Sequence, residues 1–161
     1  MKTLKSILFM AIGVLLMACD NDDDSNSFVD LSAEELSYSL VSQTNATTGV
    51  VRISGKIKNI GNTRYSSTAQ QQYAAIYEKP LGTSTETELG TLNFTNLNAG
   101  EETTFFFDRN WDIAIEFQPE FILRIVLDPD ILLDDNDAND DTNSANNSIT
   151  IQGNDINNLF N

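Results

Sequence analysis

The stretch Val51-Arg52-Ile53-Ser54-Gly55-Lys56-Ile57-Lys58, followed by Asn59-Ile60-Gly61-Asn62, decides the fold of this chain. Apolar or small side chains alternate with charged or polar ones along its first part. This two-residue period is typical of a β-strand with one buried face, and it differs from the 3.6-residue period of an amphipathic helix. The Asn-Ile-Gly-Asn sequence that follows has the composition of a turn. The stretch therefore predicts a half-buried strand that ends in a turn.

The same alternation recurs from about residue 34 onward, and turn residues such as Asn98-Ala99-Gly100 separate the alternating segments. The expected strands are residues 36–40, 51–58, 72–78, 89–94, 103–108, 121–127 and 148–152. Several short strands separated by turns, without a convincing helix, are typical of a two-sheet sandwich. We therefore predict an all-β fold, a seven-stranded antiparallel β-sandwich, with a partly open barrel as the alternative.

The N-terminal segment has the order of charges that a secretory signal has. Lys2 and Lys5 precede an uncharged apolar run at 7–18, which is too short for a membrane span of roughly 20 residues. The run ends in Leu16-Met17-Ala18-Cys19, which resembles the bacterial lipobox. The resemblance implies that residues 1–18 are a lipoprotein signal peptide that is removed, and that Cys19 carries the lipid. An ordinary secretory signal or a buried N-terminal helix is the alternative.

Residues 19–27 form an expected acidic tether that begins with Asp20-Asn21-Asp22-Asp23-Asp24. Like charges at this density repel one another and keep a segment extended. Acidic residues directly after the lipidated cysteine also resemble the surface-export signals of Bacteroidetes-type lipoproteins. That resemblance implies a lipid-anchored protein of the outer membrane that faces the cell surface. In enteric bacteria, Asp beside the cysteine instead tends to retain lipoproteins in the inner membrane.

The composition excludes several kinds of chemistry. The 161 residues include 9 basic and 24 acidic ones, no histidine and one cysteine, and the net charge is −15. Loss of Lys2 and Lys5 with the signal peptide would leave 7 basic residues and a net charge near −17, which disfavours electrostatic binding of nucleic acid. Without histidine and with the cysteine lipidated, there is no His-dependent catalysis, His-ligated zinc or disulfide.

Adjacent acidic pairs such as Glu101-Glu102, which could otherwise act as a catalytic pair of carboxylates, would point to opposite faces of a strand. We therefore expect no enzyme activity.

Three pieces of the chain resemble the CARDB domain, the cell-adhesion-related domain of bacteria. They are the turn Lys58–Asn62, the turn Leu97–Gly100 with the aromatic strand and Trp111 after it, and the acidic loop from Leu127 with Ala145-Asn146-Asn147 at its end. The resemblance covers residues 30–152. It implies an immunoglobulin-like sandwich over residues 28–153, a role in adhesion or assembly, and no catalytic residues. The connection between Gly61 and Tyr73 and the length of the acidic loop depart from the family pattern. Residues 154–161 are expected to be a short frayed tail.

Five residues of these motifs are expected to have structural roles in turns. Gly61 and Gly100 are expected to supply a positive φ, and Asn59 belongs to the first turn. Asn146 and Asn147 are expected to form Asx-type turns at the start of the last strand.

The acidic loop at residues 128–147 is the only candidate for metal chemistry. Twenty residues without obvious secondary structure are long for a compact domain, and such loops are functional or disordered. Asp135, Asp137, Asn139 and Asp141 place oxygen atoms at every second position, as the start of a calcium loop does. The match to an EF-hand is incomplete, because Asp140 stands at the glycine position and Asn146 at the position of the bidentate glutamate. The alternative is a solvated loop without a metal.

These observations together predict a lipid-anchored, non-catalytic module that makes protein or glycan contacts at the cell envelope. One alternative is a calcium-stabilised binding module that uses loop 128–147. Another is a glycan-binding accessory domain, for which the aromatic candidates are Tyr65, Tyr73, Tyr77 and Trp111. Packing in the core or at its rim is the competing role of these aromatic residues.

Overall fold

The structure is a computed structural model that describes residues 26–114 and 118–161. The expected signal peptide 1–18, the lipobox, Cys19 and most of the tether 19–27 lie outside these ranges.

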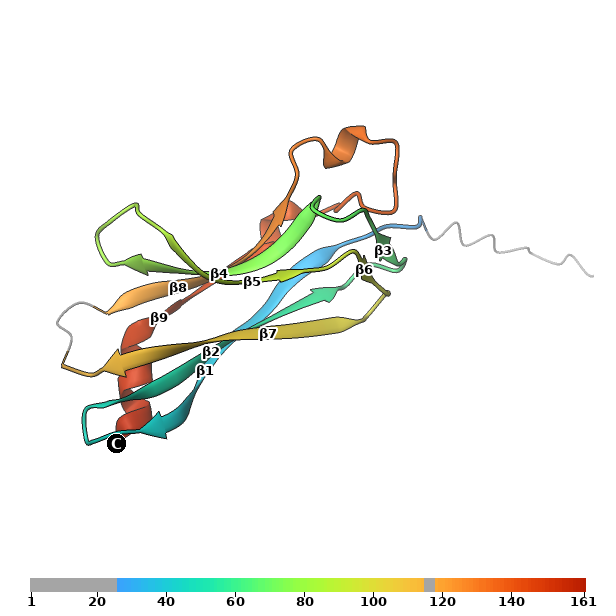
Figure 1. Ribbon diagram of the computed structural model, residues 1–161. Coiled ribbons are helices and arrows are strands. Elements are labelled where there is room, and N and C mark those ends of the chain that lie inside the picture. The colour runs from blue at the N-terminus through green and yellow to red at the C-terminus, as the bar shows by residue number, and fades with distance from the viewer. Residues whose placement is uncertain (1–25, 115–117) are drawn as a thin grey trace, which may run out of the picture.

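The described chain is all-β and its sheets are antiparallel, as the alternating sequence predicted (Figure 1). The first sheet has the order β1-β2-β7, with β1 at Leu31–Gln43, β2 at Thr48–Asn59 and β7 at Glu102–Asp112. The second has the order β5-β4-β8-β9, with β4 at Gln72–Pro80, β5 at Thr87–Asn93, β8 at Pro119–Leu127 and β9 at Ser148–Gln152. Each of the seven expected strands overlaps one of these. Two short strands that were not expected, β3 (Tyr65–Ser66) and β6 (Asn96–Leu97), pair with each other beside the sandwich.

The core lies between the two sheets. Val51, Ile53 and Ile57 of β2 are fully buried, and so are Phe121 and Leu123 of β8. Burial of such a side chain stabilises a fold by about 1.5–3 kcal/mol. The alternation of β2 therefore places its apolar row against the second sheet.

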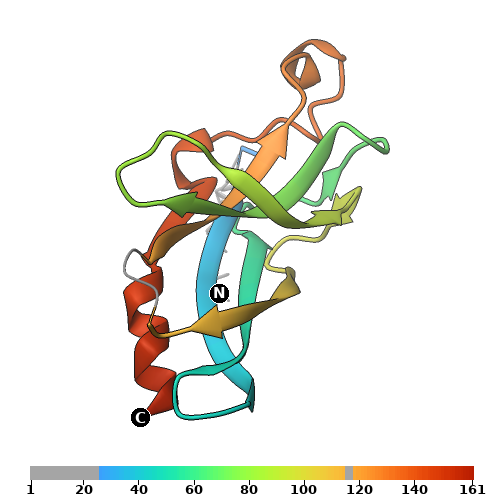
Figure 2. The ribbon, with the colours of Figure 1, turned by 60° about the vertical axis from the view of Figure 1, so that its left-hand side comes forward.

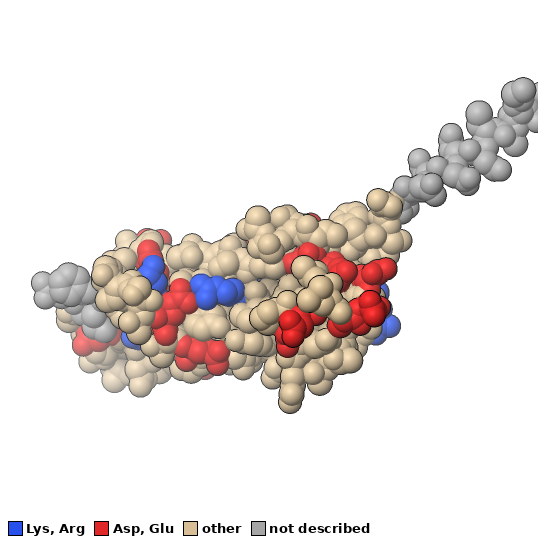
Figure 3. Space-filling view, turned by 90° about the horizontal axis from the view of Figure 1, so that it is seen from above, with Lys and Arg blue, Asp and Glu red and all other residues tan. Residues whose placement is uncertain are grey.

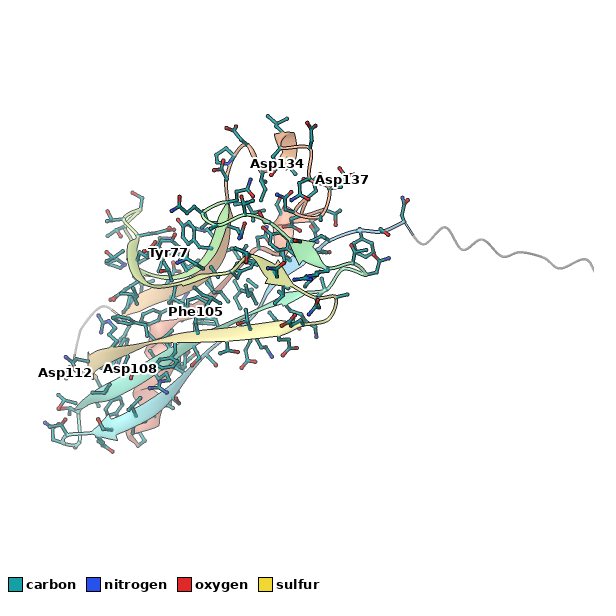
Figure 4. All side chains as sticks on the ribbon, turned by 45° about the vertical axis from the view of Figure 1, so that its right-hand side comes forward. Tyr77, Phe105, Asp108, Asp112, Asp134 and Asp137 are labelled. Atoms are coloured by element: carbon teal, nitrogen blue, oxygen red, sulfur yellow. The ribbon has the colours of Figure 1, made fainter. Side chains whose placement is uncertain are left out.

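Gly55 belongs to the same inward row as these apolar residues. A Cβ atom there would lie 2.9 Å from Cδ1 of Leu123 and 3.3 Å from Cε1 of Phe105. Phe105 itself lies between the sheets in Figure 4. The small residue therefore lets the sheets approach closely.

The outward face of the first sheet carries a ladder of ion pairs. Arg52 donates to both carboxylate oxygens of Asp108, at 2.8 and 2.9 Å. Lys58 lies 3.0 Å from Glu102 across the same strand pair. Hydrogen bonds from Arg52 and Lys58 are the largest causes that lower the pKa of Asp108 and of Glu102, respectively. Because the pairs are partly exposed, solvent screens their charges and each pair adds little to stability.

The C-terminal residues are part of the fold, so the expected frayed tail at 154–161 is wrong. Gly153–Phe160 forms the 3₁₀ helix η3, which runs along the side of the sandwich (Figure 2). Ile156 is fully buried, Phe160 is 8% exposed, and both belong to the core. Trp111 Nε1 donates to Asn157 Oδ1 at 2.9 Å. The domain therefore extends beyond residue 153, the boundary that the sequence predicted.

The two glycine-containing turns of the sequence lie side by side. The backbone N–H of Gly100 donates to the carbonyl of Asn59 at 2.8 Å. Asn59 is fully buried, and its Nδ2 donates to the carbonyls of Thr63 (2.7 Å) and Leu97 (3.0 Å). Its Oδ1 accepts from Gly61 N at 3.0 Å. Asn59 therefore connects its own turn at 59–63 to the turn at 97–100.

The two glycines are required for different reasons. Gly100 has a φ of +76°, the left-handed conformation that the sequence predicted. Gly61 is not among the residues with positive φ, so that expectation is wrong for it. A Cβ on Gly61 would lie 2.5 Å from the carbonyl oxygen of Phe28 and 2.7 Å from Asp30 N. Gly61 is therefore required because the N-terminal segment packs directly against it.

Gly61→Ala is expected to lower the free energy of unfolding by about 2–3 kcal/mol, because the methyl group would push the backbone of residues 28–30 away. Urea denaturation of the variant would measure the loss. Gly82→Ala is the control, because Gly82 has a φ of +78° but open space around its Cβ position. The control is expected to cost about 1 kcal/mol from the left-handed backbone alone. Equal losses in the two variants would contradict the close contact at Gly61.

Candidate functional site

The acidic loop 128–147 stands at one end of the sandwich, beside the point where the described chain begins (Figure 1). It contains two 3₁₀ turns, η1 (Ile131–Leu133) and η2 (Ser144–Asn146), so the expectation of a loop without secondary structure is wrong. Ile131 is 3% exposed and holds the loop onto the fold. An isolated parallel bridge joins Asp141 to Val29 of the N-terminal segment.

Side chains fasten the end of the loop to the start of β1. Asp141 accepts from Leu31 N at 3.1 Å and from Asn147 Nδ2 at 2.6 Å. Asn146 Nδ2 donates to Asp30 Oδ1 at 2.8 Å. The side chain of Asn146 thus binds the distant carboxylate of Asp30, and that of Asn147 binds Asp141 of the same loop. These contacts are not the predicted Asx-type turns. The loop is held against the segment that leads to the N-terminus.

Asp134 is the centre of a second set of contacts, and it was not among the predicted site residues. Its Oδ2 accepts from Gln71 Nε2 at 2.7 Å and from Asn139 Nδ2 at 2.8 Å. Its Oδ1 accepts from the backbone N–H of Asn136 at 3.0 Å. These bonds lower the pKa of Asp134, and the bond from Asn139 has the largest effect. The donor Gln71 lies 63 residues away in the sequence, so no local pattern could reveal this role.

The structure does not bring the four predicted calcium ligands together. Asn139 is fully buried and is held by Asp134, whereas Asp141 is directed to β1. Asp135 and Asp137 are exposed, and Asp135 has a φ of +60°. Among the residues that the structure describes, no three or more Asp, Glu, His or Cys side chains form a group that could hold a metal ion. The alternating pattern of the sequence therefore does not become one set of carboxylate ligands.

The negative charge of the loop is not neutralised by basic side chains. Six of the seven Lys and Arg residues in the described ranges form ion pairs: Arg52, Lys56, Lys58, Lys79, Arg109 and Arg124. Their partners lie on strands or in the β4–β5 connection. Within 26–114 and 118–161, no Asp of the loop takes part in an ion pair. Figure 3 shows acidic residues gathered at this end of the molecule.

A pocket of about 280 Å³ lies at the opposite end of the sandwich, near the β1–β2 hairpin. Its lining residues are Thr44, Thr48, Gly49, Val50, Asn110, Trp111 and Asp112. A second hollow of about 330 Å³ lies beside the ends of β4 and β5, and its lining residues are Ala69, Gln70, Asn93, Phe94 and Thr95. The first pocket and the acidic loop thus occupy opposite ends of the fold.

The aromatic residues considered for glycan binding divide into two groups. Tyr65 is fully buried and Trp111 is 2% exposed, so neither can present a ring to a sugar in this conformation. Burial is the main cause that raises the pKa of Tyr65 to about 12. Tyr73 and Tyr77 are half-buried on the outer face of the second sheet. The guanidinium carbon of Arg124 lies 5.1 Å from the ring centre of Tyr77.

No helix in the described part of the chain is long and apolar enough to cross a membrane.

Comparisons with known proteins give structural likeness only. No family model matches the chain, and no curated protein matches it. Among solved structures, one similar domain belongs to a protein from Methanosarcina acetivorans that is named as a cell surface protein. That domain is 19% identical, the alignment covers 78% of this chain and 90% of the domain, and the TM-score is 0.45.

Two β-glucosidases also share a partial likeness with the chain. β-Glucosidase 3B from Thermotoga neapolitana is 13% identical, and the alignment covers 78% of this chain but 16% of the enzyme, with a TM-score of 0.37. The β-D-glucoside glucohydrolase from Trichoderma reesei is 14% identical, with 78% and 19% covered and a TM-score of 0.37. Likeness at this level assigns neither a family nor an activity.

Proposed function

We propose that this chain is a lipid-anchored, non-catalytic interaction module of a bacterial cell envelope, held on the outer membrane and facing outward. The observation that carries the proposal is the sequence Leu16-Met17-Ala18-Cys19 at the end of a short apolar run, followed at once by acidic residues. A lipidated Cys19 would anchor the chain stably once it carries more than one acyl chain. A histidine-free sequence with paired basic residues agrees with a role in binding rather than catalysis.

The fold supports an immunoglobulin-like, CARDB-like assignment within this proposal. A three-stranded sheet β1-β2-β7 faces a four-stranded sheet β5-β4-β8-β9, and the chain crosses between the sheets after β2, after β5 and after β7. This order resembles that of immunoglobulin-like sandwiches, which occur in many cell-surface domains. Fold alone does not identify a ligand.

The positions of the acidic loop and the pocket at opposite ends of the sandwich indicate how an anchored module would be oriented relative to the membrane. The tether leaves from the end that carries the acidic loop, since Val29 is bridged to Asp141. In an anchored protein that end would lie nearer the membrane. The pocket beside Trp111, at the opposite end, would then face away from it and be accessible to a protein or glycan partner.

Cys19→Ala is expected to remove the chain from the membrane fraction, because the acyl chains supply the membrane affinity. Fractionation of cells and metabolic labelling with a fatty acid would measure this. Asp22→Asn is the control, because it changes the tether but leaves the lipidated cysteine intact. Protease treatment of intact cells would test the outward orientation. An unmodified thiol with an intact Met1 in the mass of the native protein would overturn the proposal.

A further inference from the structure

Buried oxygen atoms without hydrogen-bond partners gather near the acidic loop. The described residues contain six such side-chain atoms: Tyr65 Oη, Gln72 Oε1, Asn139 Oδ1, Asp140 Oδ1, Asn146 Oδ1 and Asn147 Oδ1. Four of them belong to the loop itself. Buried polar atoms in folded proteins are nearly always paired, so each unpaired atom indicates a missing partner such as a bound ion or water.

The side-chain amide of Asn139 has a paired nitrogen and an unpaired oxygen. Its Nδ2 donates to Asp134 Oδ2 at 2.8 Å and to Ser67 Oγ at 3.3 Å. A flipped amide would place an oxygen against the Asp134 carboxylate, so these contacts fix the orientation. Asn139 Oδ1 is therefore an acceptor without a donor, in a side chain with no exposed surface. The amide lies directly beside the Asp134 carboxylate, within the acidic cluster.

Asp140, the next residue of the loop, also has a buried carboxylate oxygen. Its Oδ1 has no donor. Burial raises the pKa of Asp140, and the charges of Asp137 and Asp134 raise it further. Figure 4 shows Asp134 and Asp137 on this same loop. The charges of Asp134 and Asp137 thus act on Asp140, and no Lys or Arg of the described residues forms an ion pair with any of the three.

We infer that a calcium ion binds at the base of this loop, through the Asp140 carboxylate and the buried amide oxygen of Asn139, with Asp137 as a second carboxylate and water completing the shell. Calcium accepts six to eight hard oxygen ligands, including amide oxygens and water, in flexible geometry. Such a mixed set agrees with the finding that carboxylates alone do not converge in the described residues.

The neighbouring aspartates support this site rather than contribute ligands. Asp134 already accepts three hydrogen bonds and orients the Asn139 amide. Asp141 is engaged by Leu31 N and Asn147, and fastens the loop to β1. The site therefore differs from the alternating set in the sequence, and it adds a ligand to the proposed function without depending on the lipid anchor.

Calcium is expected to raise the Tm of the full chain, purified in detergent and treated with chelator. A dissociation constant of about 10⁻⁴–10⁻³ M, usual for extracellular modules, corresponds to a rise of about 5–10 °C at roughly 10 mM calcium. Titration calorimetry would give the affinity directly. Magnesium and sodium chloride at equal ionic strength are expected to have a much smaller effect, because they would only screen the acidic charge.

The variant Asp140→Asn distinguishes a bound calcium ion from bound water at this position. Without calcium, the variant is expected to have a higher Tm than the parent chain, because a buried and repelled charge is removed. Its calcium affinity is expected to fall at least about tenfold, because one ligand charge is lost. Asp130→Asn, the same change at an exposed position of the same loop, is expected to respond like the parent chain.

Asp137→Asn is a second variant in case Asp140→Asn folds poorly, and it is also expected to weaken calcium binding. Absence of calcium-specific heat and of a Tm shift in the parent chain would overturn the inference. So would an unchanged calcium response in both Asp140→Asn and Asp137→Asn. Neither result would affect membrane fractionation of Cys19→Ala, so failure of the ion site and failure of the lipid anchor are distinguishable.

Discussion

Asn59→Ala is expected to lower the free energy of unfolding by about 3–5 kcal/mol, because it would leave one buried and two partly buried backbone groups without a partner at roughly 1–3 kcal/mol each. These groups are the carbonyls of Thr63 and Leu97 and the N–H of Gly61. The side chain is fully buried, so water cannot readily replace the lost bonds. Urea denaturation followed by circular dichroism would measure the loss.

Asn96→Ala is the matched control for this prediction. Asn96 is an exposed residue of β6 whose Oδ1 accepts from Arg64 at 2.8 Å. Because both partners are accessible to water, its loss is expected to cost less than about 1 kcal/mol. A loss at Asn59 no larger than that at Asn96 would show that the buried asparagine does not hold the two turns together.

Removal of residues 154–161 is expected to leave the domain at most marginally stable. Ile156 and Phe160 are both in the core, and their loss would remove apolar burial and leave a cavity beside the sandwich. The combined loss is about 4–8 kcal/mol, which is comparable with the total stability of many domains. The one tryptophan of the chain, Trp111, would lose its bond to Asn157. Its fluorescence would therefore report the change directly.

Ile156→Ala tests the same contact in the full-length chain, where about 2–4 kcal/mol should be lost. Asn158→Ala is the control, because Asn158 is an exposed residue of η3 and should change stability by less than about 0.5 kcal/mol. An unaltered unfolding midpoint after both the truncation and Ile156→Ala would contradict the packing of η3.

Some of the differences between sequence and structure could have been read from the sequence. Ile156, Leu159 and Phe160 are spaced by three and four residues, which is the helical spacing of an apolar face. The polar residues between them made the segment look like a tail. The packing of Gly61 offers no such signal, because the atoms that exclude its Cβ belong to residues 28–30.

For the candidate ion site, too, the sequence predicted one part and the structure was needed for the rest. Alternating acidic residues directed attention to the correct loop, and Asn139 and Asp137 belong both to that pattern and to the inferred site. The pattern could not show that Asp141 accepts a hydrogen bond from β1, or that Asp134 accepts hydrogen bonds from Gln71 and Asn139. Ligand geometry in a loop depends on turns and on distant donors, which the spacing of acidic residues does not encode.

The sequence by itself determined the all-β, antiparallel class of the fold, because the two-residue alternation is a property of neighbouring residues along one strand. It also placed the seven longer strands, since turn residues bound them. Only the tertiary structure decided which residues the acidic loop binds, why Gly61 has no side chain and where the C-terminal segment packs. These features depend on contacts between residues 30 to more than 100 positions apart, as between Asp30 and Asn146, and such contacts exist only once the sheets are stacked.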